Sequence, residues 1–166
     1  MIIVQGDKNQ GKTTQIKKII SYLLINNKSV SGFYSEKVLN FSKVVGYDIV
    51  TIPNNETFSF LQLENNKLLQ TIGPFSMDQF GLAEGVIRIK KAIIDEVDFL
   101  IIDEIGKLEL NNKGWCVPFE KAINEFKGEI IISVRTDFVE QVIKKWTLKN
   151  VQIINTSEIE FKTVFN

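Results

Sequence analysis

The sequence predicts an α/β protein with a mostly parallel central sheet, helices on both of its faces and an antiparallel insertion. Apolar runs typical of strands alternate along the chain with segments of helical periodicity. The runs within 98–103 and 129–134 are continuously apolar, as expected of strands that are covered on both faces. Short strand patterns separated by Asn-rich turns fill residues 44–73, which indicates a β-hairpin insertion there.

The helices are expected from the spacing of their apolar residues. In 15–25 and in 83–94 these residues recur every three or four positions, which places them on one face of a helix. Pro118 fits the first turn of a helix over 118–126, where its missing N–H is not needed. A last helix is expected over 137–146. The expected strands, in chain order, are 2–5, 29–35, 44–52, 57–63, 67–73, 98–103, 129–134 and 150–155.

Composition limits the function. The 166 residues suit one domain, 1–166, and Lys plus Arg equals Asp plus Glu at 20 each, so no net charge favours nucleic acid or a membrane. The chain has no histidine, which excludes histidine acid–base chemistry and histidine metal sites. Cys116 is the only cysteine, no apolar run reaches the roughly 18 residues of a membrane span, and no signal-peptide pattern opens the chain. We therefore expect a cytoplasmic protein.

Residues 6–13, GDKNQGKT, match the spacing G-x-x-x-x-G-K-[ST] between the first strand and the first helix, the context in which it predicts a phosphate-binding loop. Backbone N–H groups at the helix start face the anion in such a loop. Lys12 is expected to reach the outer phosphates and Thr13 to offer its hydroxyl to Mg²⁺. Asn9 can adopt the left-handed backbone that glycine often supplies here. The expected nucleotide-binding residues are Gly6, Asp7, Lys8, Asn9, Gln10, Gly11, Lys12, Thr13 and Thr14.

Two acidic residues end the buried strand at 98–103. Asp103 at the carboxyl end of a strand can hold Mg²⁺ through water, so Thr13 and Asp103 are the expected metal ligands. Glu104 follows directly and can turn toward an attacking water as a general base or water-orienting group. Two solvated acids at a strand end are the other reading of this pair.

Three segments together resemble the small P-loop nucleoside-triphosphatases named after a thermophile's enzyme, a family with a human cancer-related member. GDKNQGKTT is similar to the family's phosphate loop. GFYSEKV at 32–38, followed by GYDIVTI at 46–52, resembles the family's G-F-Y-T-E-E-V segment and the strand after it. DEIGKLEL at 103–110 resembles D-E-I-G-K-M-E-L and is the most specific of the three.

The resemblance implies a fold and an activity. The family fold is similar to the RecA-like branch, so we expect strand 129–134 to lie between strands 2–5 and 98–103. The family hydrolyses nucleoside triphosphates to diphosphates with Mg²⁺ and with little base preference. In agreement, no N-K-x-D guanine signature occurs in the later strands.

The chain lacks several positively charged residues that are typical of the family. Leu39 and Val44 stand where the family has arginines, Phe41 and Ser42 replace glycines, and Lys43 keeps a charge. An Asn-Arg pair that the family carries after its last strand is also missing. We therefore expect nucleotide binding to be retained and hydrolysis to be slow, unless a protein partner or a second copy of the chain supplies a cation.

The chain has two arginines, Arg88 and Arg135. Arg135 follows strand 129–134, at the sheet edge where ligands bind in open α/β sheets, so it can stabilise charge on the transferring phosphoryl group. A salt bridge or a solvated loop position is its other reading. Arg88 is expected on the exposed face of its helix. The expected catalytic groups are thus Lys12, Glu104 and Arg135.

Two other functions stay open at this point. A nucleotide or small-molecule kinase would use the same loop and metal site but pass the phosphate to an acceptor held by the 44–73 insertion. Such an enzyme would normally carry an arginine-rich lid, and the sequence shows none. A nucleotide-dependent binding module with little hydrolysis is the second alternative, and the lost arginines favour it.

Overall fold

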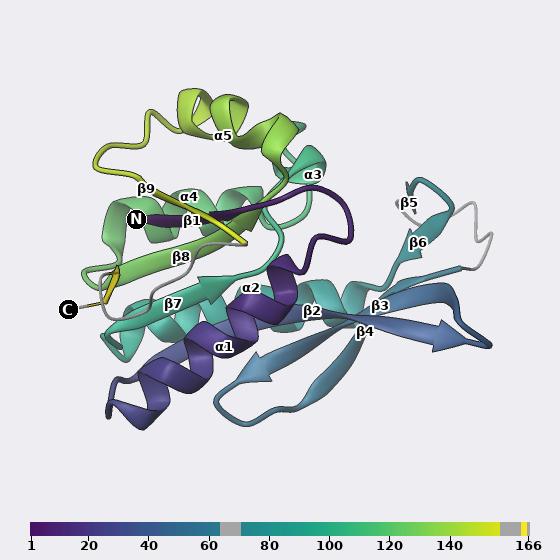
Figure 1. The fold of residues 1–166 in the computed structure, drawn as a ribbon, viewed down its shortest axis with the longest axis horizontal. Coiled ribbons are helices and arrows are strands. Elements are labelled where there is room, and N and C mark those ends of the chain that lie inside the picture. The colour runs from purple at the N-terminus through teal and green to yellow at the C-terminus, as the bar shows by residue number, and fades with distance from the viewer. Residues whose placement is uncertain (64–70, 157–163, 166) are drawn as a thin grey trace.

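The computed structural model describes residues 1–63, 71–156 and 164–165, which form one mixed sheet with helices against it (Figure 1). The strands are β1 (Ile2–Gln5), β2 (Val30–Asn40), β3 (Lys43–Ile52), β4 (Thr57–Gln62), β5 (Thr71–Ile72), β6 (Phe75–Met77), β7 (Phe99–Ile102), β8 (Glu129–Val134) and β9 (Gln152–Asn155). The helices are α1 (Lys12–Ile25), α2 (Gln79–Ile94), α3 (Lys107–Leu110), α4 (Cys116–Glu125) and α5 (Val139–Lys145), with a 3₁₀ turn at Thr136–Phe138 before α5.

The strand order is β5-β6-β4-β3-β2-β7-β8-β1-β9. Strands β2, β7, β8, β1 and β9 run parallel, and β8 lies between β1 and β7. The prediction that strand 129–134 separates the other two central strands is therefore confirmed. Because parallel strands end at the same edge, the loops after β1, β7 and β8 meet at one edge of the sheet, which β2 passes on its way to Asn40.

Two layers of apolar side chains cover the central strands. Along β7, Leu100 and Ile102 point to one face, and Ile101 points to the other. Helix α1 packs on the Ile101 side, and α2, α4 and α5 pack on the opposite side, as Figure 1 shows. This double burial explains why the strand sequences are continuously apolar.

Strands β3 to β6 form an antiparallel extension that we call the wing. Strand β3 pairs with β2 over nine residues, from Gly32 opposite Ile52 to Asn40 opposite Lys43, and β4 pairs with β3. The expected strands at 44–52 and 57–63 are confirmed, and they continue the main sheet at its edge beside β2. Of the strand expected at 67–73, only Thr71–Ile72 is described as a strand, because 67–70 lie outside the described residues.

The structure also contains short elements that the sequence patterns did not predict. Strand β6 and helix α3 are three and four residues long, too short to show a period. Across the described residues, no helix is both long and apolar enough to cross a membrane.

Candidate active site

The loop between β1 and α1 has the backbone that a phosphate cradle requires. Gly11 precedes the first residue of α1 with φ 83°, and Asn9 has φ 67°, so both adopt the left-handed conformation. The loop is braced internally, because the Gln10 amide N–H donates to the Asp7 carbonyl at 3.2 Å and the Gln10 side-chain oxygen accepts from the Asp7 N–H at 2.8 Å. The expectation that Asn9 adopts a left-handed backbone is confirmed.

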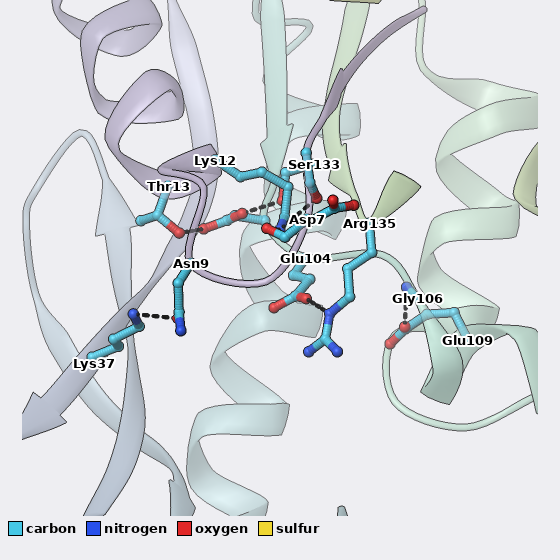
Figure 2. Close-up of polar contacts among 12 residues, drawn as sticks. Asp7, Asn9, Lys12, Thr13, Lys37, Glu104, Gly106, Glu109, Ser133 and Arg135 are labelled. Atoms are coloured by element: carbon cyan, nitrogen blue, oxygen red, sulfur yellow. Dashed lines mark hydrogen bonds and ion pairs between the residues drawn. The ribbon is translucent and has the colours of Figure 1, made fainter. Parts of the chain in front are cut away.

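Lys12 lies inside this loop. Its Nζ donates to the carbonyl oxygens of Gly6 and Asp7, both at 3.0 Å, and the residue is buried (Figure 2). Burial lowers the pKa of the Lys12 ammonium, and the nearby Glu104 carboxylate opposes that shift. A phosphate oxygen would restore a negative partner to this buried cation.

Asp103 directly follows β7, at the floor of the site. Its carboxylate accepts from the Thr13 hydroxyl at 2.9 Å, from the Ser35 backbone N–H at 3.0 Å and from the Ser133 hydroxyl. Burial raises the pKa of the Asp103 carboxyl, while the bonds from Ser133, Ser35 and Thr13 oppose the rise. One residue from each of α1, β2 and β8 thus converges on this carboxylate.

The paired Thr13 hydroxyl and Asp103 carboxylate fit Mg²⁺. This ion prefers oxygen ligands and is usually held by one or two carboxylates together with water and substrate phosphates. Within the described part of the chain no group of three or more His, Cys, Asp or Glu side chains forms a metal cage. One carboxylate with one hydroxyl is a donor set that Mg²⁺ completes with water and substrate phosphates.

Glu104 and Arg135 form an ion pair beside the loop. The Arg135 Nε donates to the Glu104 Oε1 at 2.9 Å, and the two side chains are 43% and 39% exposed. Figure 2 shows the pair beside the phosphate loop, with Arg135 arriving from the end of β8. The salt-bridge reading of Arg135 is therefore confirmed. Because the arginine also lines the cavity, its role in stabilising charge stays a prediction.

These groups surround one cavity of about 400 Å³. It is lined by Lys8, Asn9, Gly11, Lys12, Thr13, Thr14, Lys17, Ser35, Glu36, Lys37, Tyr47, Glu104 and Arg135. Of the predicted site residues, Gly6, Asp7, Gln10 and Asp103 are not in its lining: they support the loop and the floor. All the other predicted residues face the cavity.

The sequence patterns assign no role to the cavity-lining residues from β2 and β3. Ser35, Lys37 and Tyr47 lie in segments that were noted for their resemblance to a family, without any role being assigned to single residues. A signal was present, since a polar Ser35 directly after the apolar Phe33 and Tyr34 indicates where β2 leaves the core. The cross-strand register that brings Tyr47 beside Lys37 could not be read from the sequence.

Arg88 corrects a prediction. It was expected on the exposed face of its helix, but its side chain is 12% exposed and its Nη2 lies 2.7 Å from the Glu56 carboxylate. Glu84, one turn earlier on α2, lies 3.6 Å away. The wing folds over α2 and covers the arginine, so the helical pattern alone could not reveal this burial.

Glu109 is a buried acid just behind the site. Its carboxylate oxygens accept from the backbone N–H groups of Gly106 at 3.0 Å and Trp115 at 3.1 Å, and the residue is 1% exposed. Burial raises the pKa of the Glu109 carboxyl from 4.5 to about 7, although both N–H bonds oppose the shift. The side chain ties the start of α3 to the start of α4, beneath the segment that carries Glu104.

This burial predicts a pH dependence of stability. Between pH 4.5 and about 7 the folded protein keeps a proton on Glu109 that the unfolded chain has lost, so rising pH lowers the free energy of unfolding by up to about 3 kcal/mol. Relative to Glu109→Gln, the wild type should lose stability over this interval and stay level above it. Urea unfolding at several pH values measures the difference, with the exposed Glu125→Gln as control. A difference that does not change with pH would contradict the prediction.

The position of β8, between the strand that leads into the phosphate loop and the strand that ends in Asp103, makes this a P-loop nucleotide-binding protein with RecA-like strand order. Comparison with known proteins agrees. A model of the family described as NTPase matches residues 1–163, so the chain belongs to the NTPase family.

Named relatives cover most of the chain. The nucleoside-triphosphatase THEP1 of Thermotoga maritima is 31% identical over 144 residues, 85% of this chain and 79% of that protein. The protein of the same name from Methanocaldococcus jannaschii is 26% identical over 166 residues, 99% of this chain and 95% of its own length.

Two solved structures share the fold. The crystal structure of THEP1 from Aquifex aeolicus superposes with a TM-score of 0.73 at 23% identity, covering 94% of this chain and 90% of that one. The solution structure of a human cancer-related nucleoside triphosphatase gives 0.72 at 21% identity, with 93% and 87% covered. Both support the predicted fold.

Proposed function

We propose that this chain hydrolyses nucleoside triphosphates to diphosphates and inorganic phosphate with Mg²⁺, slowly and with little base selectivity. The observation that carries the proposal is the convergence of Lys12, Thr13 and Glu104 on one cavity at the carboxyl edge of the sheet. The names of the relatives, nucleoside-triphosphatases, support the same reaction. A cytoplasmic location, where nucleoside triphosphates are available, belongs to this proposal.

The phosphates are held by the loop. On binding, phosphate oxygens take the place of the Gly6 and Asp7 carbonyls as partners of the Lys12 ammonium, and the N–H groups at the start of α1 face the same anion. Thr13 and Asp103 would hold Mg²⁺, which neutralises charge on the outer phosphates when bound. No acceptor other than water is needed for the reaction.

Hydrolysis requires a base and a cation near the terminal phosphate. Glu104 orients the attacking water and accepts its proton, and Arg135 stabilises the charge on the transferring group. In the structure these two side chains bind each other at 2.9 Å, so the arginine turns from the carboxylate to the phosphate when it acts on the transferring group. This rearrangement supports slow turnover by the isolated chain, and a protein partner or a second copy could accelerate it by supplying another cation.

Phosphoryl transfer to a bound acceptor is the second candidate function. Lys37 and Tyr47 extend the cavity lining onto β2 and the wing, where an acceptor could lie beside the terminal phosphate. Whether water or another acceptor takes the phosphoryl group therefore depends on cavity residues outside the phosphate loop.

Replacing Lys12 with alanine tests the site. Because a buried charge–phosphate contact disappears, affinity for Mg²⁺ with a non-hydrolysable triphosphate should fall at least about tenfold. Isothermal titration measures it, with Lys18→Ala, an exposed lysine on the same helix, as the matched control. Equal affinities for Lys12→Ala and the wild type would return residues 6–13 to the status of a structural turn.

A further inference from the structure

Strand β2 leads from the core to the nucleotide cavity, where its residue Lys37 lines the wall. Phe33 packs in the core, and the N–H of Ser35, two residues on, donates to the Asp103 carboxylate at 3.0 Å. Lys37 follows after two more residues and lies on the same face, because side chains alternate along a strand. Lys37 therefore lies two residues further along β2 than Ser35, whose N–H contacts the expected metal ligand Asp103.

The neighbouring strand shows that this face looks into the cavity. Tyr47 on β3 lies directly opposite Lys37 and also lines the cavity. Its ring packs edge-on against Phe75 with the ring centres 5.5 Å apart. Burial and then the nearby Glu104 raise the pKa of the Tyr47 hydroxyl, which agrees with a ring beside the Glu104–Arg135 pair. Lys37 and Tyr47 thus form the wall of the cavity that faces the phosphate loop.

The Lys37 ammonium points at the phosphate loop and has a neutral partner. Its Nζ donates to the Asn9 side-chain oxygen at 2.8 Å, a contact drawn in Figure 2. Two other cavity cations, Lys17 and Arg135, are paired with Glu36 and Glu104. Within the described residues, Lys37 has no carboxylate at ion-pair distance. Its charge is therefore available to an anion in the loop.

We propose that Lys37 contacts the terminal phosphate of a bound nucleoside triphosphate and makes the site prefer triphosphates over diphosphates. The inference rests on the proposed function. Lys12 approaches the phosphates from α1, whereas Lys37 approaches from β2 across Asn9, at the outer side of the same loop. When a diphosphate is bound with its last phosphate at Lys12, the Lys37 ammonium keeps its hydrogen bond to Asn9. The additional phosphate of a triphosphate extends far enough to contact the Lys37 ammonium.

Lys37→Met tests the proposal through the ratio of two affinities. With Mg²⁺ present, affinity for a non-hydrolysable triphosphate should fall about tenfold or more, and affinity for the diphosphate should stay within about twofold. Lys37→Arg keeps the charge and should retain the preference. Lys43→Met, an exposed lysine on β3 outside the cavity lining, is the matched control and should leave both affinities unchanged. An unchanged ratio in Lys37→Met would overturn the proposal.

Asn9→Gly separates phosphate contact from loop bracing. Glycine keeps the left-handed backbone at this position and removes the amide that holds Lys37. If Lys37 acts on the phosphate, the Asn9→Gly protein retains the preference for triphosphate. If Lys37 only braces the loop, Asn9→Gly loses the preference to the same extent as Lys37→Met, and the proposal fails.

Lys12→Ala, measured alongside, distinguishes a failure of the proposed nucleotide site from a failure of the inference about Lys37. Wild-type affinity in Lys12→Ala would remove the proposed nucleotide site, and the inference about Lys37 with it. Weakened binding of both nucleotides in Lys12→Ala, together with an unchanged ratio in Lys37→Met, would remove the inference alone.

Discussion

Replacing Glu104 with glutamine should lower kcat by about 10²–10⁴-fold, the range of a positioned general base, while affinity for the triphosphate is retained. Glutamine keeps the size of the side chain, and its oxygen can still accept the hydrogen bond from Arg135. The substitution therefore removes the basic carboxylate with little change in the arrangement around it. Phosphate release under saturating nucleotide measures kcat, and titration measures affinity.

Two variants make the Glu104 result specific. Asp103→Asn should instead shift the Mg²⁺ concentration needed for activity, because it alters the carboxylate bonded to Thr13. Glu140→Gln on the exposed side of α5 should leave both quantities unchanged. A Glu104→Gln protein that hydrolyses at the parent rate would show that another group activates the water.

Removing the Arg135 guanidinium should slow hydrolysis by about 10²–10³-fold, the loss expected when a donor to developing negative charge disappears. Arg135→Ala also frees Glu104 from its ion pair, so the affinity for the triphosphate and kcat should change by different amounts. From a wild-type turnover well under about 1 s⁻¹, Arg135→Ala should be close to the detection limit of a phosphate assay.

Arg88→Ala is the matched arginine control. Arg88 pairs with Glu56 on the wing, outside the cavity lining, so its loss should leave kcat of the folded protein unchanged. Rapid turnover by dilute wild-type protein, unaffected by Arg135→Ala, would show that the lysines suffice. Phosphate release that rises faster than linearly with protein concentration would show that a second copy supplies a cation.

The fold was largely predictable because its signals are local. Continuous apolar runs identified β7 and β8, and the Gly6 to Thr13 spacing identified the strand–loop–helix unit. The placement of β8 between β1 and β7 followed from the family resemblance, since strand order leaves no trace in residue periodicity. The left-handed Asn9 was predictable because few residues other than glycine and asparagine tolerate that backbone.

The rest of the site depends on contacts between segments far apart in the chain. Lys37 and Tyr47 meet only through the β2–β3 register, and Arg88 is buried only because the wing covers it. The raised pKa of Glu109 arises from its burial between α3 and α4. Helix α3 has only four residues, which is too short for a periodic pattern to reveal it. No periodic pattern in the sequence reports such tertiary effects.

Product analysis tests the central claim most directly. The purified chain is incubated with Mg²⁺ and a triphosphate labelled on the terminal phosphate, with and without candidate acceptors, beside Lys12→Ala. We expect inorganic phosphate and diphosphate to form in equal amounts without any acceptor, and we expect Lys12→Ala to abolish both. Diphosphate formation that requires an acceptor, with the label transferred to that acceptor, would contradict this expectation in favour of a kinase. Tight binding without any turnover would contradict it in favour of a nucleotide-dependent binding module.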